Sequence, residues 1–293
     1  MSERRDAADQ RAAFAWRRAA RHALLILVSF LTLLPVFWVV KIALSGSNTF
    51  QGADLSPIPP VVSAANFTAV VTARDAEGHA LFLRQLFNSV AVSVLTTLLG
   101  ISVACTAAYA FSRFRFVGRR SGLFLFLVSQ MFPGILMMVP LYVIMQKLHL
   151  LDTILGLVLV YSITTMPFSV WMLKGYFDTI PRDLEEAAIM DGASPARVFW
   201  SVVLPLSAPA VAITALFSFM TAWNEFVLAY TFLSRETAFT LPVTIRNFVG
   251  EHTVQWGYFA AASILVSLPV VALFFALQRY LVSGLTAGGV KGG

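Results

Sequence analysis

Six apolar stretches, each about as long as a membrane crossing, constrain the fold of this chain most strongly. A helix rises about 1.5 Å per residue, so a hydrocarbon core of about 30 Å needs about 20 mostly apolar residues. Stretches of that length run over residues 23–44, 87–111, 122–146, 154–173, 205–229 and 258–282. Backbone groups in lipid have no water to bond, so these stretches predict an all-α membrane protein with six transmembrane helices.

The balance of apolar and charged residues argues against a soluble domain. Hydrophobic residues make up 58% of the chain and charged residues 12%, with a mean hydropathy of +0.77. About a quarter of the residues in a typical soluble domain are charged. One compact core of 293 residues cannot hide this much apolar surface. We therefore predict a single transmembrane domain over residues 1–293.

Lysine and arginine are distributed unevenly among the segments that connect the stretches. If the N-terminus is cytoplasmic, the inward segments hold most of the 21 basic residues. The outward segments hold only Lys41, Arg74, Arg84, Lys147, Arg235 and Arg246. Basic residues gather on the cytoplasmic side of membrane proteins. The asymmetry therefore predicts that both termini are cytoplasmic, which agrees with an even number of spans.

Small residues and prolines inside the stretches predict packed, kinked helices. Gly100, Ala104 and Ala108 recur at every fourth position, a spacing that lets helix backbones approach closely. Prolines interrupt the stretches at Pro35, Pro133, Pro140, Pro167, Pro209 and Pro269. Each removes a backbone hydrogen bond, and several together favour helices around a pathway over a plain membrane anchor.

Residue patterns for metal binding and catalysis are missing from the sequence. The single cysteine, Cys105, lies in an apolar stretch and cannot form a disulfide within the chain. The four histidines, His22, His79, His149 and His252, lack the spacing of metal ligands. The sequence holds neither a G-x-x-x-x-G-K-[ST] phosphate loop nor a Ser-His-Asp set. We therefore expect no bound metal or cofactor and no enzymatic activity in this chain.

The inward segment from Pro181 to Pro205 predicts two short helices joined by a tight turn. Pro181 suits the first position of a helix, and Gly192 suits the left-handed residue just past its end. Ser194 followed by Pro195 is typical of the cap and first residue of a second helix.

Both predicted helices are amphipathic, so their apolar faces need cover. The faces comprise Leu184, Ala187 and Ala188 in the first helix and Val198, Phe199, Val202 and Val203 in the second. The cover could be the chain's own transmembrane helices, the lipid interface or another protein. Acidic residues outnumber basic ones here, which disfavours nucleic acid, and an interfacial lipid helix would carry more Lys and Arg. A protein partner is the better fit.

The same loop resembles a known family signature. Glu186-Ala-Ala-Ile-Met-Asp-Gly192-Ala, followed by Phe199 and Val202-Val-Leu-Pro205, is similar to the EAA signature of binding-protein-dependent ABC importer permeases. The C-terminal run from Gln278 to Gly292 and the segment Trp223-Asn-Glu-Phe226 are similar to the carbohydrate (maltose/maltodextrin, MalG-like) members. The resemblance covers nearly the whole chain. It implies a type I ABC importer permease fold in the bacterial cytoplasmic (inner) membrane.

The resemblance also implies partners and a coupling site. Segment 175–204 would be a cytoplasmic coupling loop seated in a groove of an ATPase subunit. The implied coupling residues are Glu186, Ala187, Ala188, Asp191, Gly192, Leu204 and Pro205. The implied tail contacts with the ATPase dimer are Thr286, Gly288, Gly289 and Lys291. The assembly would contain a second permease subunit, two ATPase copies that hydrolyse ATP, and an external solute-binding protein.

Three polar residues in or near the apolar stretches are candidates for a pathway or gate. They are Gln130, Asn224 and Glu225, and ionisable groups close to a membrane are costly and often functional. About twenty helical residues separate Glu225 from Pro205, or about 30 Å, which places Glu225 at the outer surface. There, Asn224 and Glu225 could line an outer gate or form hydrogen bonds between subunits.

The implied function is import of a carbohydrate, with maltose or maltodextrin favoured. Other sugars and glycerol phosphates remain alternative cargoes. A self-contained secondary transporter is a second class of function, and it would carry charged residues near the bilayer midplane and inverted repeats. Neither feature occurs in the sequence. A membrane scaffold or receptor without transport is the third class.

Overall fold

The computed structural model describes the backbone of residues 2–48, 56, 58–250 and 253–289, and the side chains of 16–48, 56, 58–250 and 253–278. Within these residues the regular structure is helical, with isolated β-bridges such as Ser45 to Ser63 but no strand. The helices group into two compact units. The first holds residues 1–70 and 248–265, and the second holds residues 71–247 and 266–293.

The first unit joins the end of α1 (Ser2–Ala43) to the start of α13 (Trp256–Gly289) through polar contacts. The Asn66 side chain, on α2 (Ala65–Thr72), donates to the carbonyl oxygens of Ala43 at 3.1 Å and Ser47 at 3.3 Å. Gly257 packs directly against these groups. A Cβ on Gly257 would lie 2.4 Å from the Ser47 oxygen, so this contact requires glycine.

The second unit is built around α3 (Leu81–Arg113), which packs against α6 (Ile154–Phe177) and α10 (Ala208–Asn224). The predicted stripe of Gly100, Ala104 and Ala108 is buried in α3. A Cβ on Gly100 would lie 3.5 Å from Thr165 Oγ1 of α6 and 3.7 Å from Ser218 Oγ of α10. The small residues therefore allow the three helices to meet, as their spacing indicates.

Two of the six predicted spans are broken rather than straight. The third consists of α4 (Arg119–Met131) and α5 (Gly134–Lys147), which meet at 102°, and α10, in the fifth, meets the preceding segment Pro195–Leu206 at 78°. Four helices in the described residues are long and apolar enough to cross a membrane alone, and each bent pair can supply one more. The prediction of six spans is thus confirmed, with two of them bent. Pro133, which lacks an N–H, stands at the first break.

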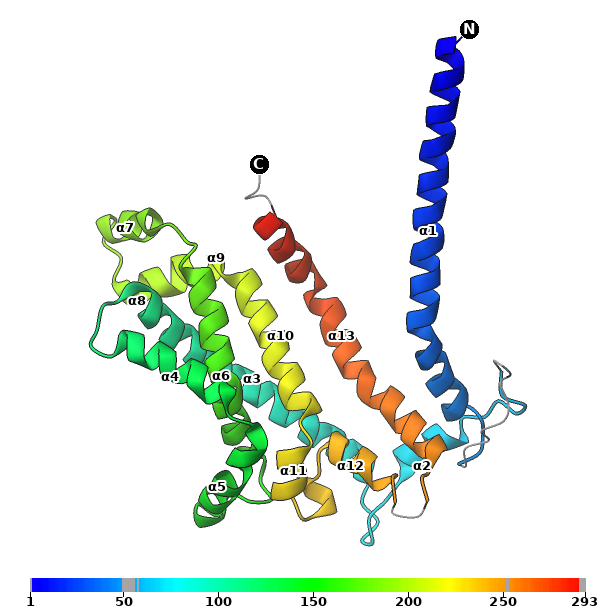
Figure 1. Ribbon diagram of the computed structural model, residues 1–293. Coiled ribbons are helices and arrows are strands. Elements are labelled where there is room, and N and C mark those ends of the chain that lie inside the picture. The colour runs from blue at the N-terminus through cyan, green and yellow to red at the C-terminus, as the bar shows by residue number, and fades with distance from the viewer. Residues whose placement is uncertain (1, 49–55, 57, 251–252, 290–293) are drawn as a thin grey trace. The chain divides into compact units, whose positions relative to one another are not determined.

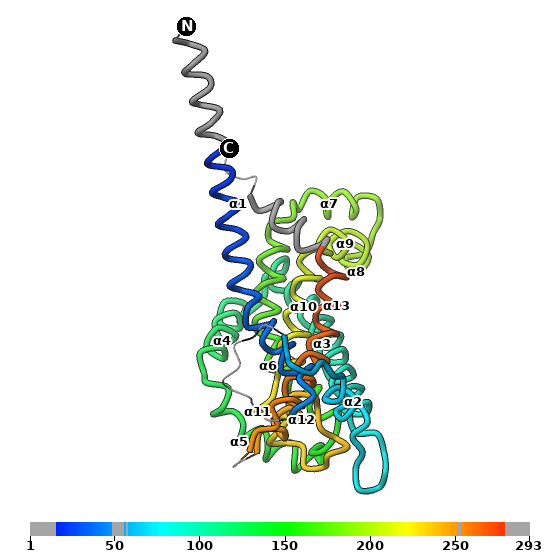
Figure 2. Tube along the Cα trace, turned by 90° about the vertical axis from the view of Figure 1, so that its right-hand side faces the viewer, coloured from blue at the N-terminus to red at the C-terminus, as the bar shows by residue number. Residues whose placement is uncertain are grey.

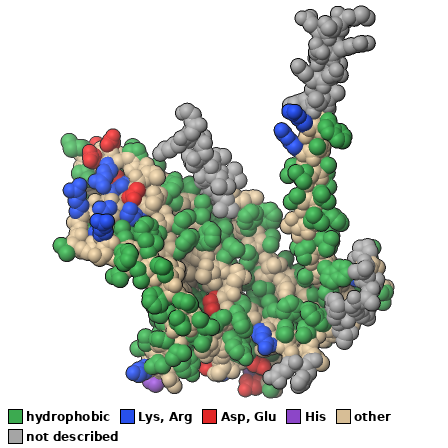
Figure 3. All heavy atoms as spheres, viewed as in Figure 1, with side chains coloured by type: hydrophobic (Ala, Val, Ile, Leu, Met, Phe, Trp, Pro, Cys, Tyr) green, Lys and Arg blue, Asp and Glu red, His purple; other side chains and the backbone are tan. Residues whose placement is uncertain are grey.

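Short helices complete the second unit and lie at its two ends. Both views place α7, α8 and α9 at one end and α11 and α12 at the other (Figures 1 and 2). Their bounds are α7 (Arg182–Met190), α8 (Pro195–Val198), η1 (Phe199–Val203), α9 (Leu204–Leu206), α11 (Val227–Phe232), η2 (Glu236–Ala238) and α12 (Leu241–Asn247). Charged side chains gather at the α7 end, whereas hydrophobic side chains cover much of the flank (Figure 3). This distribution fits a membrane crossing between the two ends.

The predicted fifth span, 205–229, is wrong as one continuous helix. The α10 helix ends at Asn224, Glu225 has an extended backbone, and a new helix, α11, begins at Val227. The Glu225 carboxylate accepts the backbone N–H groups of Leu228 at 2.8 Å and Ala229 at 3.0 Å. Since a helix start leaves such groups without partners, this side chain stabilises the break.

Gly257 provides a test of the packing between α1 and α13. We expect Gly257→Ala to destabilise the protein by about 1–3 kcal/mol, because the added methyl overlaps the Ser47 oxygen. The matched control is Gly175→Ala in α6, where a Cβ meets nothing within 4 Å. Thermal unfolding in detergent measures both variants. Equal midpoints for the two would contradict the assigned contact.

Candidate functional site

The loop from Pro181 to Pro205 folds as a hairpin of two short helices. Gly192 has φ +87°, the left-handed conformation that its sequence position predicts. The N–H of Ala193 donates to Ala188 O at 3.0 Å and that of Gly192 to Ile189 O at 2.9 Å, which closes the end of α7. The predictions for the turn are confirmed. One detail differs, because Pro181 precedes the first helical residue, Arg182.

The second arm of the hairpin packs against the chain's own transmembrane helices. Val198, Phe199 and Val203 are buried in one cluster with residues of α3 and α6, including Ala108 and Phe177. The sequence allowed three partners for the apolar face of this second helix: the transmembrane helices, the lipid interface or another protein. In the structure the transmembrane helices cover it. The second arm is therefore the root of the hairpin.

The first arm, α7, presents apolar side chains outward. Leu184 is 46% exposed, Ile189 51% and Met190 87%. On the predicted face Ala187 is also exposed, whereas Ala188 is half-buried. The described residues thus leave much of the apolar surface of α7 uncovered, at the charged end of the second unit (Figure 3).

Glu185, which the sequence analysis did not select, holds α7 in place. Its side chain is 9% exposed, and Arg113 Nε of α3 donates to Glu185 Oε1 at 2.5 Å. The Tyr109 hydroxyl donates to Glu185 Oε2 at 3.0 Å, and Arg113 Nη2 donates to Ile180 O at 3.1 Å. The next residue, Glu186, is exposed. The two adjacent glutamates therefore have different roles, one facing the α3 helix and one facing outward.

A second carboxylate extends this contact to α6. The Asp178 carboxylate accepts hydrogen bonds from Ser112 Oγ at 2.6 Å and from Lys174 Nζ at 2.5 Å. Ser112 Oγ in turn accepts a hydrogen bond from Arg113 Nη1 at 3.0 Å. Burial by itself raises the pKa of Asp178, but hydrogen bonds from Lys174 and Ser112 and the nearby cations bring the pKa below its ordinary value. The ends of α3, α6 and α7 are thus joined by one polar network.

The predicted coupling residues lie on or near the outer side of this hairpin. Exposed positions are Glu186, Ala187, Asp191, Gly192 and Pro205, and half-buried positions are Ala188 and Leu204. Of the predicted tail residues, Thr286, Gly288 and Gly289 belong to the last turns of the α13 backbone, and their side chains lie outside the described ones. Lys291 lies outside the described residues altogether.

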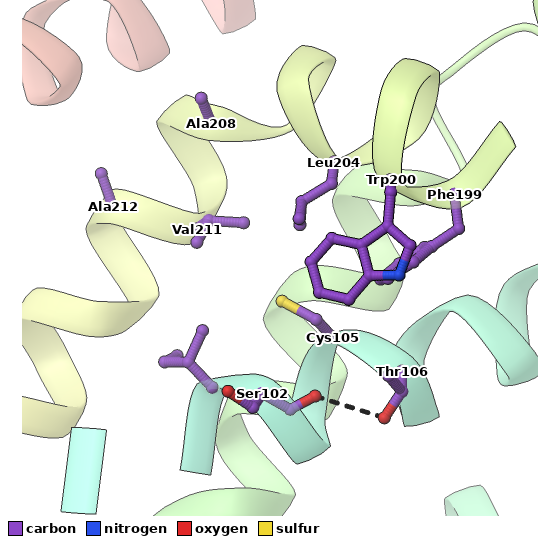
Figure 4. A pocket seen from close by; sticks show the side chains of 10 residues that line it. Ser102, Cys105, Thr106, Phe199, Trp200, Leu204, Ala208, Val211 and Ala212 are labelled. Atoms are coloured by element: carbon purple, nitrogen blue, oxygen red, sulfur yellow. Dashed lines mark hydrogen bonds between the residues drawn. The ribbon is translucent and has the colours of Figure 1, made fainter. Parts of the chain in front are cut away.

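An apolar cavity of about 380 Å³ adjoins the root of the hairpin. The Trp200 ring and Leu204 extend toward α3, where Cys105 and Ser102 lie (Figure 4). Its polar groups are engaged by their own helix, since Thr106 Oγ1 donates to Ser102 O at 3.2 Å and Ser102 Oγ to Leu98 O at 2.6 Å. The cavity therefore suits apolar contacts rather than a polar solute.

A second cleft, of about 520 Å³, lies where α4 bends into α5, beside α6 and the break between α10 and α11. Both Gln130 and Glu225 line it, so the fold brings two of the three predicted pathway residues together. Asn224 is exposed and donates to Met220 O of its own helix at 2.9 Å, and it does not line the cleft.

The Glu225 carboxylate is oriented by the chain itself. The hydroxyl of Tyr161, which is buried in α6, donates to Glu225 Oε2 at 2.6 Å, in addition to the two N–H groups of α11. Gln130 Nε2 donates to Thr164 O of α6 at 3.4 Å. Glu225 thus has both a structural role at the helix break and a place on the cleft wall.

A family model for the inner membrane component of binding-protein-dependent transport systems matches residues 96–287. The chain belongs to this family. The matched region contains the hairpin, its polar network with α3 and α6, and the cleft. Family membership confirms the prediction of an inner-membrane permease component of an ABC transporter, which is not itself an enzyme.

Two curated permeases are similar over most of their length. The trehalose transport permease SugB of Mycobacterium tuberculosis is 36% identical over 94% of this chain and 99% of its own. The trehalose/maltose transport permease MalG of Thermococcus litoralis is 38% identical over 91% of this chain and 94% of its own. Both relatives are named as sugar transport permeases.

A solved structure confirms the fold. A chain of a bacterial ABC transporter that imports the acidic polysaccharide alginate superposes with a TM-score of 0.75. The match covers 89% of this permease and 95% of that chain at 22% identity. The predicted fold of an ABC importer permease is therefore confirmed.

The buried ion pair gives a prediction that separates the two glutamates. We expect Glu185→Gln to destabilise the permease by about 3–5 kcal/mol, because it removes the charged group to which the buried Arg113 is bonded. Glu186→Gln makes the same chemical change at an exposed position and should leave stability nearly unchanged. Thermal unfolding midpoints in detergent measure the difference. A larger effect at Glu186 would contradict the assigned anchor.

Proposed function

We propose that this permease forms half of the translocation pathway of an ATP-driven carbohydrate importer. The observation that carries the proposal is the similarity, over more than nine-tenths of the chain, to permeases named for trehalose and for trehalose and maltose. These names describe the relatives, and both sugars that they mention are small neutral disaccharides. Maltose or maltodextrin is the favoured cargo. That preference rests on the resemblance of the C-terminal run and of Trp223-Asn-Glu-Phe226 to maltose permeases, and trehalose is the other candidate, because it appears in both names.

The exposed face of α7 supports coupling to a cytoplasmic ATPase. This face combines apolar side chains, among them Ile189 and Met190, with the carboxylate of Glu186 and the small side chain of Ala187. An apolar surface at a charged, water-facing end is typical of a site that docks a protein. The sequence holds no phosphate loop of its own. We therefore assign ATP hydrolysis to a partner subunit and docking to the predicted coupling residues.

The polar network at the hairpin supports transmission of force into the membrane. Because Glu185 bonds to Arg113 of α3, and Asp178 to Ser112, a displacement of α7 pulls on the helix at the centre of the second unit. Closure of an ATPase dimer would then move the packed spans as a body, which is a known means of alternating access. Arg113 and Glu185 have a positioning role in this scheme.

The proposed assembly contains a second permease subunit, two ATPase copies and an external solute-binding protein. The family description itself names dependence on a binding protein. The predicted tail residues, Thr286, Gly288, Gly289 and Lys291, are proposed contacts with the ATPase dimer.

Gly192 provides the test of the coupling hairpin. Gly192 has a left-handed backbone, which costs a residue with a Cβ about 1–2 kcal/mol. A bulky residue relieves that cost by moving the turn away from its docking position, and a loss of about 1.4 kcal/mol in docking free energy weakens binding about tenfold. We expect Gly192→Trp to insert normally but to lose most ATPase co-purification and transport. Gly192→Asn is the matched control, because asparagine tolerates this conformation. Wild-type transport by Gly192→Trp would contradict the coupling role.

Uptake into proteoliposomes tests the function. The chain is reconstituted with its partner permease and binding protein, with and without the ATPase subunit, and offered labelled maltose, maltotriose, trehalose and glycerol 3-phosphate. We expect accumulation of a neutral sugar that requires both ATPase and ATP. Uptake by this chain without the ATPase would instead indicate a secondary transporter. The affinity of the binding protein for the same panel identifies the sugar.

A further inference from the structure

We infer that the cleft at the bend between α4 and α5 is a contact site for a neutral, hydroxyl-rich solute and disfavours anionic solutes. The inference rests on the proposed function and narrows its substrate class. The cleft volume, about 520 Å³, falls within the range of about 300–1,000 Å³ that small-molecule sites occupy. Its walls combine apolar side chains such as Phe132 and Ile163 with a few polar groups, which is typical of such sites.

Glu225 gives the lining of the cleft a negative charge. Among the described residues that line it, Glu225 is the one ionisable group, and none is Lys, Arg or His. The groups bonded to its carboxylate are the Tyr161 hydroxyl and two backbone N–H groups, all of them neutral. An anion entering the cleft therefore meets a like charge with no lining cation to offset it.

The polar groups that line the cleft are mainly hydrogen-bond acceptors. A carboxylate accepts at about four positions, and the bonds to Tyr161, Leu228 and Ala229 occupy three of those on Glu225. The hydroxyl protons of Ser129 and Thr164 are used within their own helices, since they donate to Phe126 O at 2.8 Å and Tyr161 O at 2.9 Å. These side chains thus offer mainly acceptor oxygens to a ligand.

A surface of acceptors selects for donors. A sugar presents many O–H donors, whereas a phosphate dianion or a carboxylate presents only acceptors and negative charge. Gln130 adds an amide that both donates and accepts. The cavity beside Trp200 differs, because its walls are apolar and its polar groups bond to their own helix. The solute class therefore follows from the composition of this particular cleft.

Thiol labelling in the assembled importer tests the charge of the cleft. A reactive thiol is placed by Ser129→Cys in a Cys105→Ala background, and its modification is followed by the mass of this chain. Rates with cationic and anionic methanethiosulfonates are each divided by the rate with a free thiol in solution. We expect the cationic reagent to react about tenfold faster after this correction. Glu225→Gln should abolish the difference, whereas Tyr161→Phe keeps the carboxylate and should preserve it.

Protection by solutes tests the ligand class with the same thiol. We expect maltose or trehalose in millimolar excess to slow labelling by a neutral methanethiosulfonate, and glycerol 3-phosphate at equal concentration to leave it unchanged. Equal protection by glycerol 3-phosphate, protection by neither, or no labelling at all would overturn the assignment.

The labelling and uptake results separate the two proposals. Sugar uptake without charge-selective labelling or protection overturns the cleft assignment alone. Charge-selective labelling and sugar protection in vesicles that show no ATP-driven sugar uptake overturns the proposed importer function, and the solute class of the cleft stands.

Discussion

The structure depends on one constraint, that backbone polar groups in an apolar medium need partners wherever a helix is interrupted. Glu225 supplies acceptors at the break between α10 and α11. Polar residues buried on α3 do the same for the irregular segment before α12. Asn88 donates to Thr237 O and Phe239 O, and Ser89 Oγ accepts the N–H of Leu241 at 2.7 Å. Side chains therefore bond the backbone at these interruptions, from the break itself in the case of Glu225 and from α3 in the case of Asn88 and Ser89.

The same constraint explains why charged residues sit where they do. Arg113 and Glu185 are each 9% exposed, and burial of either alone would be costly, so each stabilises the other's position. Their bond ties the exposed hairpin to α3, which also packs on α6 and α10. The helix that carries the small-residue stripe is thus the one to which Glu185 of α7 is bonded. Close packing and the ion pair together make the hairpin an extension of the membrane unit.

Two hollows in the second unit have different chemistry despite similar surroundings. Beside the hairpin, hydroxyls bond to their own helix and Trp200 supplies an apolar wall (Figure 4). At the α4–α5 bend, the carboxylate of Glu225, which accepts a hydrogen bond from Tyr161, lines the space. The difference arises because the second hollow lies at two helix breaks, where a polar side chain, Glu225, bonds the free backbone N–H groups and also lines the cleft.

The sequence by itself determined the helical membrane fold, the approximate spans and the turn of the hairpin. Span length, the Gly100–Ala108 spacing and the caps at Gly192 and Ser194 are local properties, readable from neighbouring residues. Only the tertiary structure decided that Glu185 rather than Glu186 is buried, and that Gln130 and Glu225 share a cleft while Asn224 does not. Adjacent helical positions differ by about 100° in direction. Which of them meets Arg113, 72 residues away in sequence, depends on how the helices pack.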